Sequence, residues 1–144
     1  MTLAAHSSGP AFVFMLTKAD QTVPEAITLL PIVREAAVGH AGAKDIGLPL
    51  PELARLFVGF REAGCRTYLE VVSSTPDAMR AAAHTAIEVG ADVLLGGTDR
   101  PTIFAALRGT GILFFPYVGT VVGHPCLLRG EIIDIVDDAR RAES

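Results

Sequence analysis

The sequence lacks the features that mark a nucleic-acid-binding protein. It contains no tryptophan, and only 6% of its residues are aromatic. Its 12 basic residues are outnumbered by 16 acidic ones, so the formal net charge is −4 at pH 7, and no basic cluster is present. A nucleic-acid surface needs a concentrated stripe of lysine and arginine. Nucleic acid is therefore not an expected partner.

Cysteines and long apolar runs are also scarce. The two cysteines, Cys65 and Cys126, lie far apart and match no metal-binding spacing, so no metal site is predicted. No uninterrupted apolar run approaches the roughly 18 residues of a membrane-spanning helix. The first ten residues have neither the basic nor the apolar region of a signal peptide. The sequence predicts a cytoplasmic protein that makes no membrane contact.

What the chain has in plenty is apolar residues, in a regular arrangement. Of its 144 residues, 50% are hydrophobic and only 19% are charged. This composition and length predict one globular domain with a real core. We expect residues 1–10, which are small and polar, to form a flexible tail, and residues 11–144 to form a single domain.

The clearest pattern lies between residues 67 and 98. The run T-Y-L-E-V-V-S predicts a strand over residues 66–73. Thr75 and Pro76 are typical of a helix start, and Gly90 of a helix end. A second apolar run over residues 91–95 predicts the next strand. Strand, helix and strand in this order form a βαβ unit.

The same pattern recurs along the chain and predicts an α/β fold. Five strands are expected, over residues 11–17, 40–46, 66–73, 91–95 and 111–118, with helices between them and a last helix over 131–141. Regular alternation favours a parallel sheet built from five consecutive βα units. The sheet could be part of a TIM-like barrel, although a complete barrel needs ~250 residues. The alternative, which length alone favours, is an open flavodoxin-like doubly wound sheet.

Several motifs resemble those of a known family. They are F-M-L-T-K-A-D-Q-T-V-P-E-A, A-K-D-I-G-L-P, Y-L-E-V-V-S, L-L-G-G-T and V-V-G-H-P-C-L-L-R-G. Together they resemble the first five βα units of a poorly characterised TIM-barrel family that is loosely labelled 4-hydroxythreonine-4-phosphate dehydrogenase. More distantly, they resemble the phosphate-binding barrels of histidine and tryptophan biosynthesis. The resemblance covers residues 11–140 and implies a partial TIM barrel, but three later βα units of the family have no counterpart here.

Charged residues at the predicted strand ends are the candidate catalytic groups. In parallel α/β folds, ligands bind at the carboxyl ends of the strands. Lys44 could form a Schiff base if its pKa were lowered, and Asp45 could act as a general base or hold a divalent metal. Glu70 lies within a strand and could act as a general base. A structural ion pair between Lys44 and Glu70 is the alternative.

Five further residues are candidates for substrate binding. Gly96, Gly97 and Thr98 precede a predicted helix, so their N–H groups could hold an anion, although two glycines also form ordinary tight turns. Lys18 is either a cation at the site or the solvated start of a loop. His124 lies in the long loop over residues 119–130 and could line the opening.

These residues predict a function but not a unique one. The first hypothesis is a lyase or isomerase that acts on a small phosphorylated carbonyl compound by acid/base chemistry at the strand ends. The alternatives are an incomplete or self-associating barrel fragment without its own catalysis, which would form a homo-oligomer, and a small-molecule-binding module. No cofactor is assigned. All of these site assignments require that Lys44 and Glu70 meet at one opening of the sheet.

Overall fold

The protein is built on a five-stranded parallel sheet. The structure is a computed structural model that describes residues 10–72, 74–123 and 126–143, so the predicted tail lies outside the described residues except for Pro10. The strand order follows the chain: β1 (Phe14–Met15), β4 (His40–Lys44), β5 (Arg66–Val71), β6 (Val93–Gly96) and β7 (Leu113–Phe115). A flavodoxin-like sheet must reverse its strand order. The order never reverses here, so the flavodoxin-like alternative is wrong.

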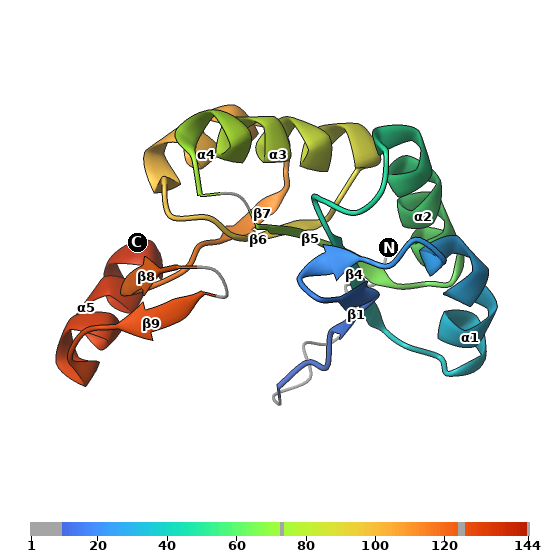
Figure 1. The fold of residues 1–144 in the computed structure, drawn as a ribbon, viewed down its shortest axis with the longest axis horizontal. Helices are drawn as coiled ribbons and strands as arrows, with labels where there is room; N and C mark the ends of the chain where they lie inside the picture. Colours follow the sequence, from blue (N-terminus) through green and yellow to red (C-terminus); the bar gives the residue numbers. More distant parts are fainter. Residues whose placement is uncertain (1–9, 73, 124–125, 144) are drawn as a thin grey trace.

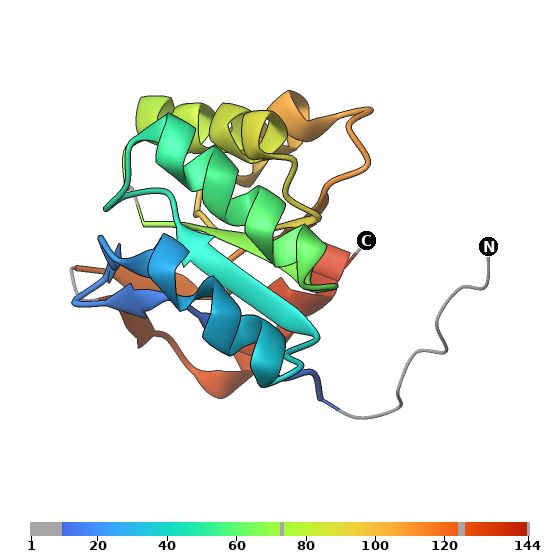
Figure 2. The ribbon, with the colours of Figure 1, turned by 90° about the vertical axis from the view of Figure 1, so that its right-hand side faces the viewer.

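Helices form a layer outside this sheet (Figure 1). In chain order they are the 3₁₀ helix η1 (Ala26–Leu29), α1 (Leu30–Glu35), α2 (Leu50–Glu62), α3 (Pro76–Val89) and α4 (Arg100–Leu107). Neighbouring helices α1, α2 and α3 lie side by side (Figure 2). Pro31 stands in the first turn of α1, where its missing N–H is tolerated, so the chain restarts a helix there as predicted.

The core lies between the sheet and the helical layer. Leu53, Leu56, Phe57 and Phe60 recur at helical spacing on α2, as predicted, and all four are buried. Alternate residues of the strands meet them, because successive side chains of a strand point to opposite faces. The strand residues in this core include Ala41, Ala43, Leu69, Val71 and Leu94.

The predicted starts of α3 and α4 are confirmed. The Thr75 hydroxyl accepts a hydrogen bond from the N–H of Ala78 at 3.3 Å, and the Asp99 carboxylate accepts one from the N–H of Thr102 at 3.2 Å. Each side chain satisfies an N–H group that the first helical turn leaves unpaired. Gly90 ends α3 with φ +66°, a conformation that favours glycine.

The segment after β1 differs from its prediction. The expected exit loop over residues 18–20 belongs to an antiparallel hairpin formed by β2 (Thr17–Lys18) and β3 (Gln21–Thr22). Thr22 was expected to cap the next helix together with Glu25. Its buried hydroxyl instead accepts from the Lys44 N–H at 2.8 Å and donates to the Lys44 carbonyl at 2.9 Å. This exchange attaches the hairpin to the end of β4.

The chain after β7 also differs from its prediction. The expected long loop over residues 119–130 contains an antiparallel hairpin of β8 (Thr120–Val122) and β9 (Leu127–Arg129). Helix α5 (Ile132–Glu143) follows it. We call residues 119–143, described except for 124 and 125, the C-terminal arm. It stands apart from the layer of α1 to α4 (Figure 1).

An ion pair attaches the C-terminal arm to the sheet domain. The guanidinium of Arg100 at the start of α4 contacts the Asp138 carboxylate of α5 and donates to the Tyr117 carbonyl at 2.9 Å. Asp138 also accepts from the Gly119 N–H at 2.8 Å. The Arg100 hydrogen bond, followed by the Gly119 N–H, lowers the pKa of Asp138 to about 2. Asp138 is therefore an anion at neutral pH and holds α5 beside the hairpin.

Candidate functional site

Lys44 and Glu70 lie opposite each other on adjacent strands. They are register partners in the β4–β5 ladder. Leu69 and Val71, the neighbours of Glu70 in the chain, belong to the core beneath the helices. Because side chains alternate along a strand, Glu70 points to the face of the sheet away from that core. The side chain of Lys44 is 12% exposed and that of Glu70 is 22% exposed.

Four polar side chains converge at the carboxyl ends of the strands. The Lys44 ammonium lies 3.4 Å from a carboxylate oxygen of Glu70 and also forms an ion pair with Asp20. The Tyr117 hydroxyl donates a hydrogen bond of 2.9 Å to the other Glu70 oxygen. We call Asp20, Lys44, Glu70 and Tyr117 the charged cluster. The prediction that Lys44 and Glu70 meet at one opening is confirmed.

The protonation of Lys44 differs from the prediction. Burial lowers the pKa of its ammonium, but the hydrogen bond to Asp20 and the nearby charges of Glu70 and Asp20 outweigh this effect. The net result is a pKa above the ordinary value of 10.5. A Schiff base needs a free amine, which a lowered pKa would supply. That part of the prediction is wrong, and Lys44 is a cation at neutral pH.

Two members of the charged cluster were missed from the sequence. Tyr117 follows β7, and Asp20 lies in the turn of the β2–β3 hairpin with φ +64°. Burial and the hydrogen bond to Glu70 raise the pKa of the Tyr117 hydroxyl, so it remains a donor at neutral pH. The available signal was its position at the carboxyl end of the fifth predicted strand. A tyrosine there fits the rule that nominated Lys44 and Glu70.

Asp45 follows Lys44 but has a different set of contacts. Its backbone N–H donates to the Glu70 carbonyl at 3.0 Å, and its carboxylate accepts from the Val72 N–H at 3.0 Å. Asp45 therefore joins the ends of β4 and β5. Burial raises the pKa of its carboxyl, while the Val72 N–H acts in the opposite direction. Such a carboxyl is costly to keep ionised in the folded protein.

The raised pKa of Asp45 gives a pH-dependent prediction for Asp45→Asn. A carboxyl with a raised folded-state pKa stabilises the fold below its unfolded value, near 3.8, and this contribution is lost as the pH rises through the folded value. The amide keeps the acceptor for Val72 and cannot ionise. Asp45→Asn should therefore be more stable than wild type at pH 7, whereas the two should converge at pH 3. Urea unfolding at both pH values measures the difference.

The control for this prediction is Asp77→Asn, because the Asp77 side chain is 93% exposed. It should change stability little at either pH. A loss of stability in Asp45→Asn at pH 7 would mean that the Asp45 charge itself holds the strand ends together.

The predicted glycine turn lines a small cavity beside the charged cluster. The cavity has a volume of about 270 Å³, and Gly97, Thr98 and Tyr117 contribute to its wall. Gly97 has φ +80°, and the N–H groups of Gly97 and Thr98 have no acceptor among the described residues. Gly96 is needed for close packing, because a Cβ there would lie 3.0 Å from the Tyr117 ring. Tyr117 thus connects the cavity to Glu70.

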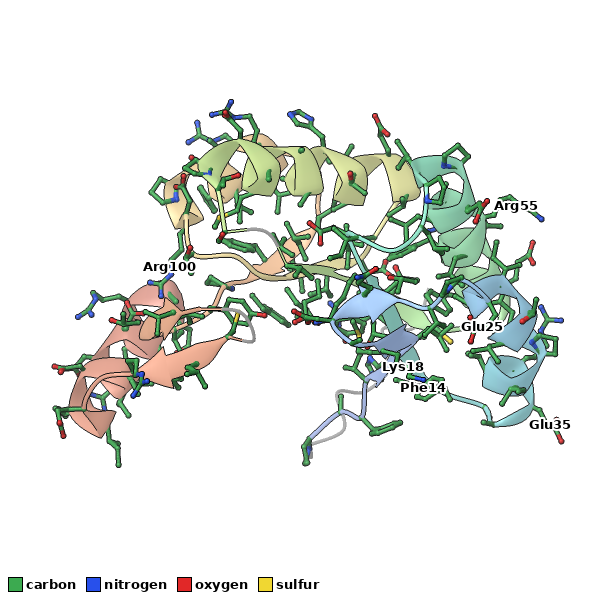
Figure 3. The ribbon with its side chains drawn as sticks, in the orientation of Figure 1. Phe14, Lys18, Glu25, Glu35, Arg55 and Arg100 are labelled. Atoms are coloured by element: carbon green, nitrogen blue, oxygen red, sulfur yellow. The ribbon has the colours of Figure 1, made fainter. Side chains whose placement is uncertain are left out.

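The remaining predicted binding residues are not brought to this opening. Lys18 lies on strand β2 with an exposed side chain that has no ion-pair partner among the described residues (Figure 3). This position agrees with the solvated alternative for Lys18. His124 lies outside the described residues.

Searches for metal and membrane features cover the same part of the chain. Residues 10–72, 74–123 and 126–143 contain no group of three or more histidine, cysteine, aspartate or glutamate side chains that could hold a metal ion. Within these ranges, no helix has both the length and the apolar character needed to cross a membrane.

Comparison with known proteins adds no assignment. No family model matches the chain, and neither a curated protein nor a solved structure matches it. The argument about function therefore depends on the geometry of this site.

Proposed function

We propose that the protein is a lyase or isomerase that removes a proton next to the carbonyl group of a small phosphorylated compound. The observation that carries this proposal is the position of Glu70 between a cation and a hydroxyl donor. Lys44 lies 3.4 Å from one of its oxygens and the Tyr117 hydroxyl lies 2.9 Å from the other. A base beside two groups that can stabilise an oxyanion is what enolisation requires.

The three side chains have complementary roles in this reaction. Glu70 takes the proton from the carbon next to the carbonyl, and the electron pair of the broken C–H bond moves to the carbonyl oxygen. The Lys44 ammonium and the Tyr117 hydroxyl stabilise the negative charge on that oxygen. Glu70 then returns the proton to the neighbouring carbon in an isomerisation, or the electron pair expels a leaving group in an elimination.

The cavity beside Tyr117 supplies a place for the phosphate. Its wall includes Gly97 and Thr98, whose N–H groups have no acceptor among the described residues. Consecutive N–H groups of this kind bind anions in other proteins. A phosphate held there would place the rest of a small molecule against Tyr117, and Tyr117 contacts Glu70.

The strand order supports a finer description of the fold. Five parallel strands in chain order, with helices outside them, are arranged as in one sector of a TIM barrel. We therefore propose a partial TIM-barrel-like fold, related to the family that the motifs resemble. The charged cluster lies at the carboxyl ends of the strands, where the active sites of such barrels are found.

Exchange of carbon-bound hydrogen with solvent tests the proposal. The wild-type protein is incubated in heavy water with dihydroxyacetone phosphate, and NMR follows the loss of its C–H signals. Catalysed exchange is expected, and Glu70→Gln should slow it by about 100-fold or more, because it removes the base. Tyr117→Phe should slow it less, and dihydroxyacetone without phosphate should exchange more slowly than the phosphorylated compound.

Lys18→Met is the matched control in this experiment, since Lys18 is an exposed lysine outside the charged cluster. It should leave exchange unchanged. Equal exchange rates for wild type and Glu70→Gln would refute the role of Glu70. Absence of exchange with a panel of small phosphorylated ketones and aldehydes would refute the reaction class.

A second candidate is a barrel fragment or binding module without its own catalysis. The observation that favours it is the complete pairing of the site, since every buried side-chain nitrogen or oxygen among the described residues has a hydrogen-bond partner. A purely structural ion pair would have the same geometry. This candidate predicts that Glu70→Gln lowers stability but leaves ligand binding and hydrogen exchange unaffected.

A further inference from the structure

The C-terminal arm carries an unusual number of exposed apolar side chains. In helix α5, no residue is buried, although Ile132, Ile133 and Val136 are large and apolar. Their exposed fractions are 81%, 63% and 38%. The hairpin adds Val122, Leu127 and Leu128, and the adjacent strand β7 adds Leu113 and Phe115. A continuous apolar surface of this kind normally marks an interaction site.

Helix α5 uses only one side for contacts within the chain. Ile135 packs near Gly119, where an added Cβ would lie 3.0 Å from the Ile135 side chain. Ile132, Ile133 and Val136 are left in solvent and recur at the i, i+1 and i+4 spacing of a helix face. An amphipathic helix gains most of its stability by burying such a face. The face therefore needs a partner.

We propose that this face packs antiparallel against the same face of α5 in a second copy of the chain. The charges of α5 support a partner identical to itself. Asp134 and Asp137 lie in its first half, whereas Arg140 and Arg141 lie near its end. A two-fold axis places the acidic half of one helix beside the basic end of the other. Antiparallel packing also brings each helix N-terminus near the C-terminus of its partner, which is favourable for the helix dipoles.

The exposed area of the chain is large enough for such an interface. The chain exposes 8965 Å², whereas a compact monomer of 15.1 kDa exposes about 7,100 Å². Residues 1–9 contribute to the total, so the difference of about 1,900 Å² is an upper bound on the area that folding leaves unburied. A standard interface takes only about 800 Å² from each partner. Less than half of the difference is therefore sufficient.

This association would also affect the cavity. Val121, Gly123 and Cys126 of the hairpin line it, together with Tyr117. Since α5 packs against the same hairpin, a second copy that holds α5 also restricts the hairpin. The association does not depend on catalysis, and it would occur equally in a binding protein.

Sedimentation equilibrium and light scattering over a range of concentrations test the proposal. The wild type is expected to dimerise, and Ile133→Glu should weaken dimerisation by about 100-fold, because it places a charge in the centre of the interface on both copies. The matched control is Ile32→Glu on α1, since Ile32 is similarly exposed, at 57%. It should dimerise like the wild type. Both positions are exposed, so circular dichroism should show unchanged folding.

Two results would overturn the proposal. The first is a wild-type chain that remains monomeric at the highest concentration reached. The second is a dimer that Ile133→Glu leaves as tight as in the wild type, because association would then use another surface, such as the unpaired edges of β1 and β7. Equal weakening by Ile32→Glu and Ile133→Glu would also count against α5 as the interface.

Discussion

Replacement of Phe57 by alanine is expected to lower the free energy of unfolding by about 4 kcal/mol. Phe57 lies at the centre of the core on α2, is fully buried, and meets Phe60 edge-on with a ring separation of 5.7 Å. The substitution removes the burial of the ring, leaves a cavity, and breaks this aromatic pair. Since domains of this size have only about 5–15 kcal/mol of stability, the variant should be marginally folded. Urea unfolding followed by circular dichroism measures the loss.

The next residue in the chain provides the control. Val58 is 46% exposed on the solvent side of α2. Val58→Ala should change the free energy of unfolding by less than about 0.5 kcal/mol. If Phe57→Ala lost no more than Val58→Ala, the core would not lie between α2 and the sheet.

Replacement of Lys44 by methionine is expected to cost about 2 kcal/mol of stability at pH 7. The variant keeps the approximate volume of the side chain but leaves Asp20 and Glu70 without the cation between them. Their side chains are 29% and 22% exposed, so water reduces the cost below that of a fully buried pair. Chemical unfolding of both proteins at constant salt measures the difference.

The pH dependence of this cost distinguishes charge from packing. Because the folded-state pKa of Lys44 lies above 10.5, its contribution to stability is complete below that value and is lost as the pH rises through the folded value. The difference between wild type and Lys44→Met should therefore shrink in strongly alkaline solution. A difference that stays constant with pH would show that packing, and not charge, holds Lys44 in place. Lys18→Met, at an exposed lysine, should cost less than about 0.5 kcal/mol.

These two variants separate the fold from the site. Phe57 lies on the helix side of the sheet, and Lys44 lies at the end of β4 among the charged cluster. If Lys44→Met lowers stability and also abolishes hydrogen exchange, the ion pair contributes to both. If it lowers only stability, the structural candidate is the better account of the charged cluster.

The regular part of the fold was predictable because local signals agreed with burial. The apolar spacing on α2 and the capping residues Thr75 and Asp99 specify their helices without help from distant residues. The segments that were predicted wrongly depend on distant partners. Thr22 looked like a helix cap, but its hydroxyl bonds to the backbone of Lys44 across 22 positions of sequence. A local motif carries no record of such a competitor.

The candidate site was predictable in part for the same reason. Lys44 and Glu70 were expected together because neighbouring parallel strands end at one edge, and they are register partners. Tyr117 reaches Glu70 across 47 positions, and Asp20 reaches Lys44 across 24. No spacing in the sequence joins these pairs. The direction of the Lys44 pKa shift also depends on Asp20, so it could not be predicted without that contact.

The sequence by itself determined the alternation of strands and helices, the buried face of α2 and the carboxyl-end position of the charged residues, since periodicity, caps and chain direction are local properties. The tertiary structure decided the strand order, the pairing of Tyr117 and Asp20 with the ion pair, and the exposure of α5. The physical reason is that these features arise from contacts between residues far apart in the chain. Their energies depend on burial and distance, which only the folded arrangement defines.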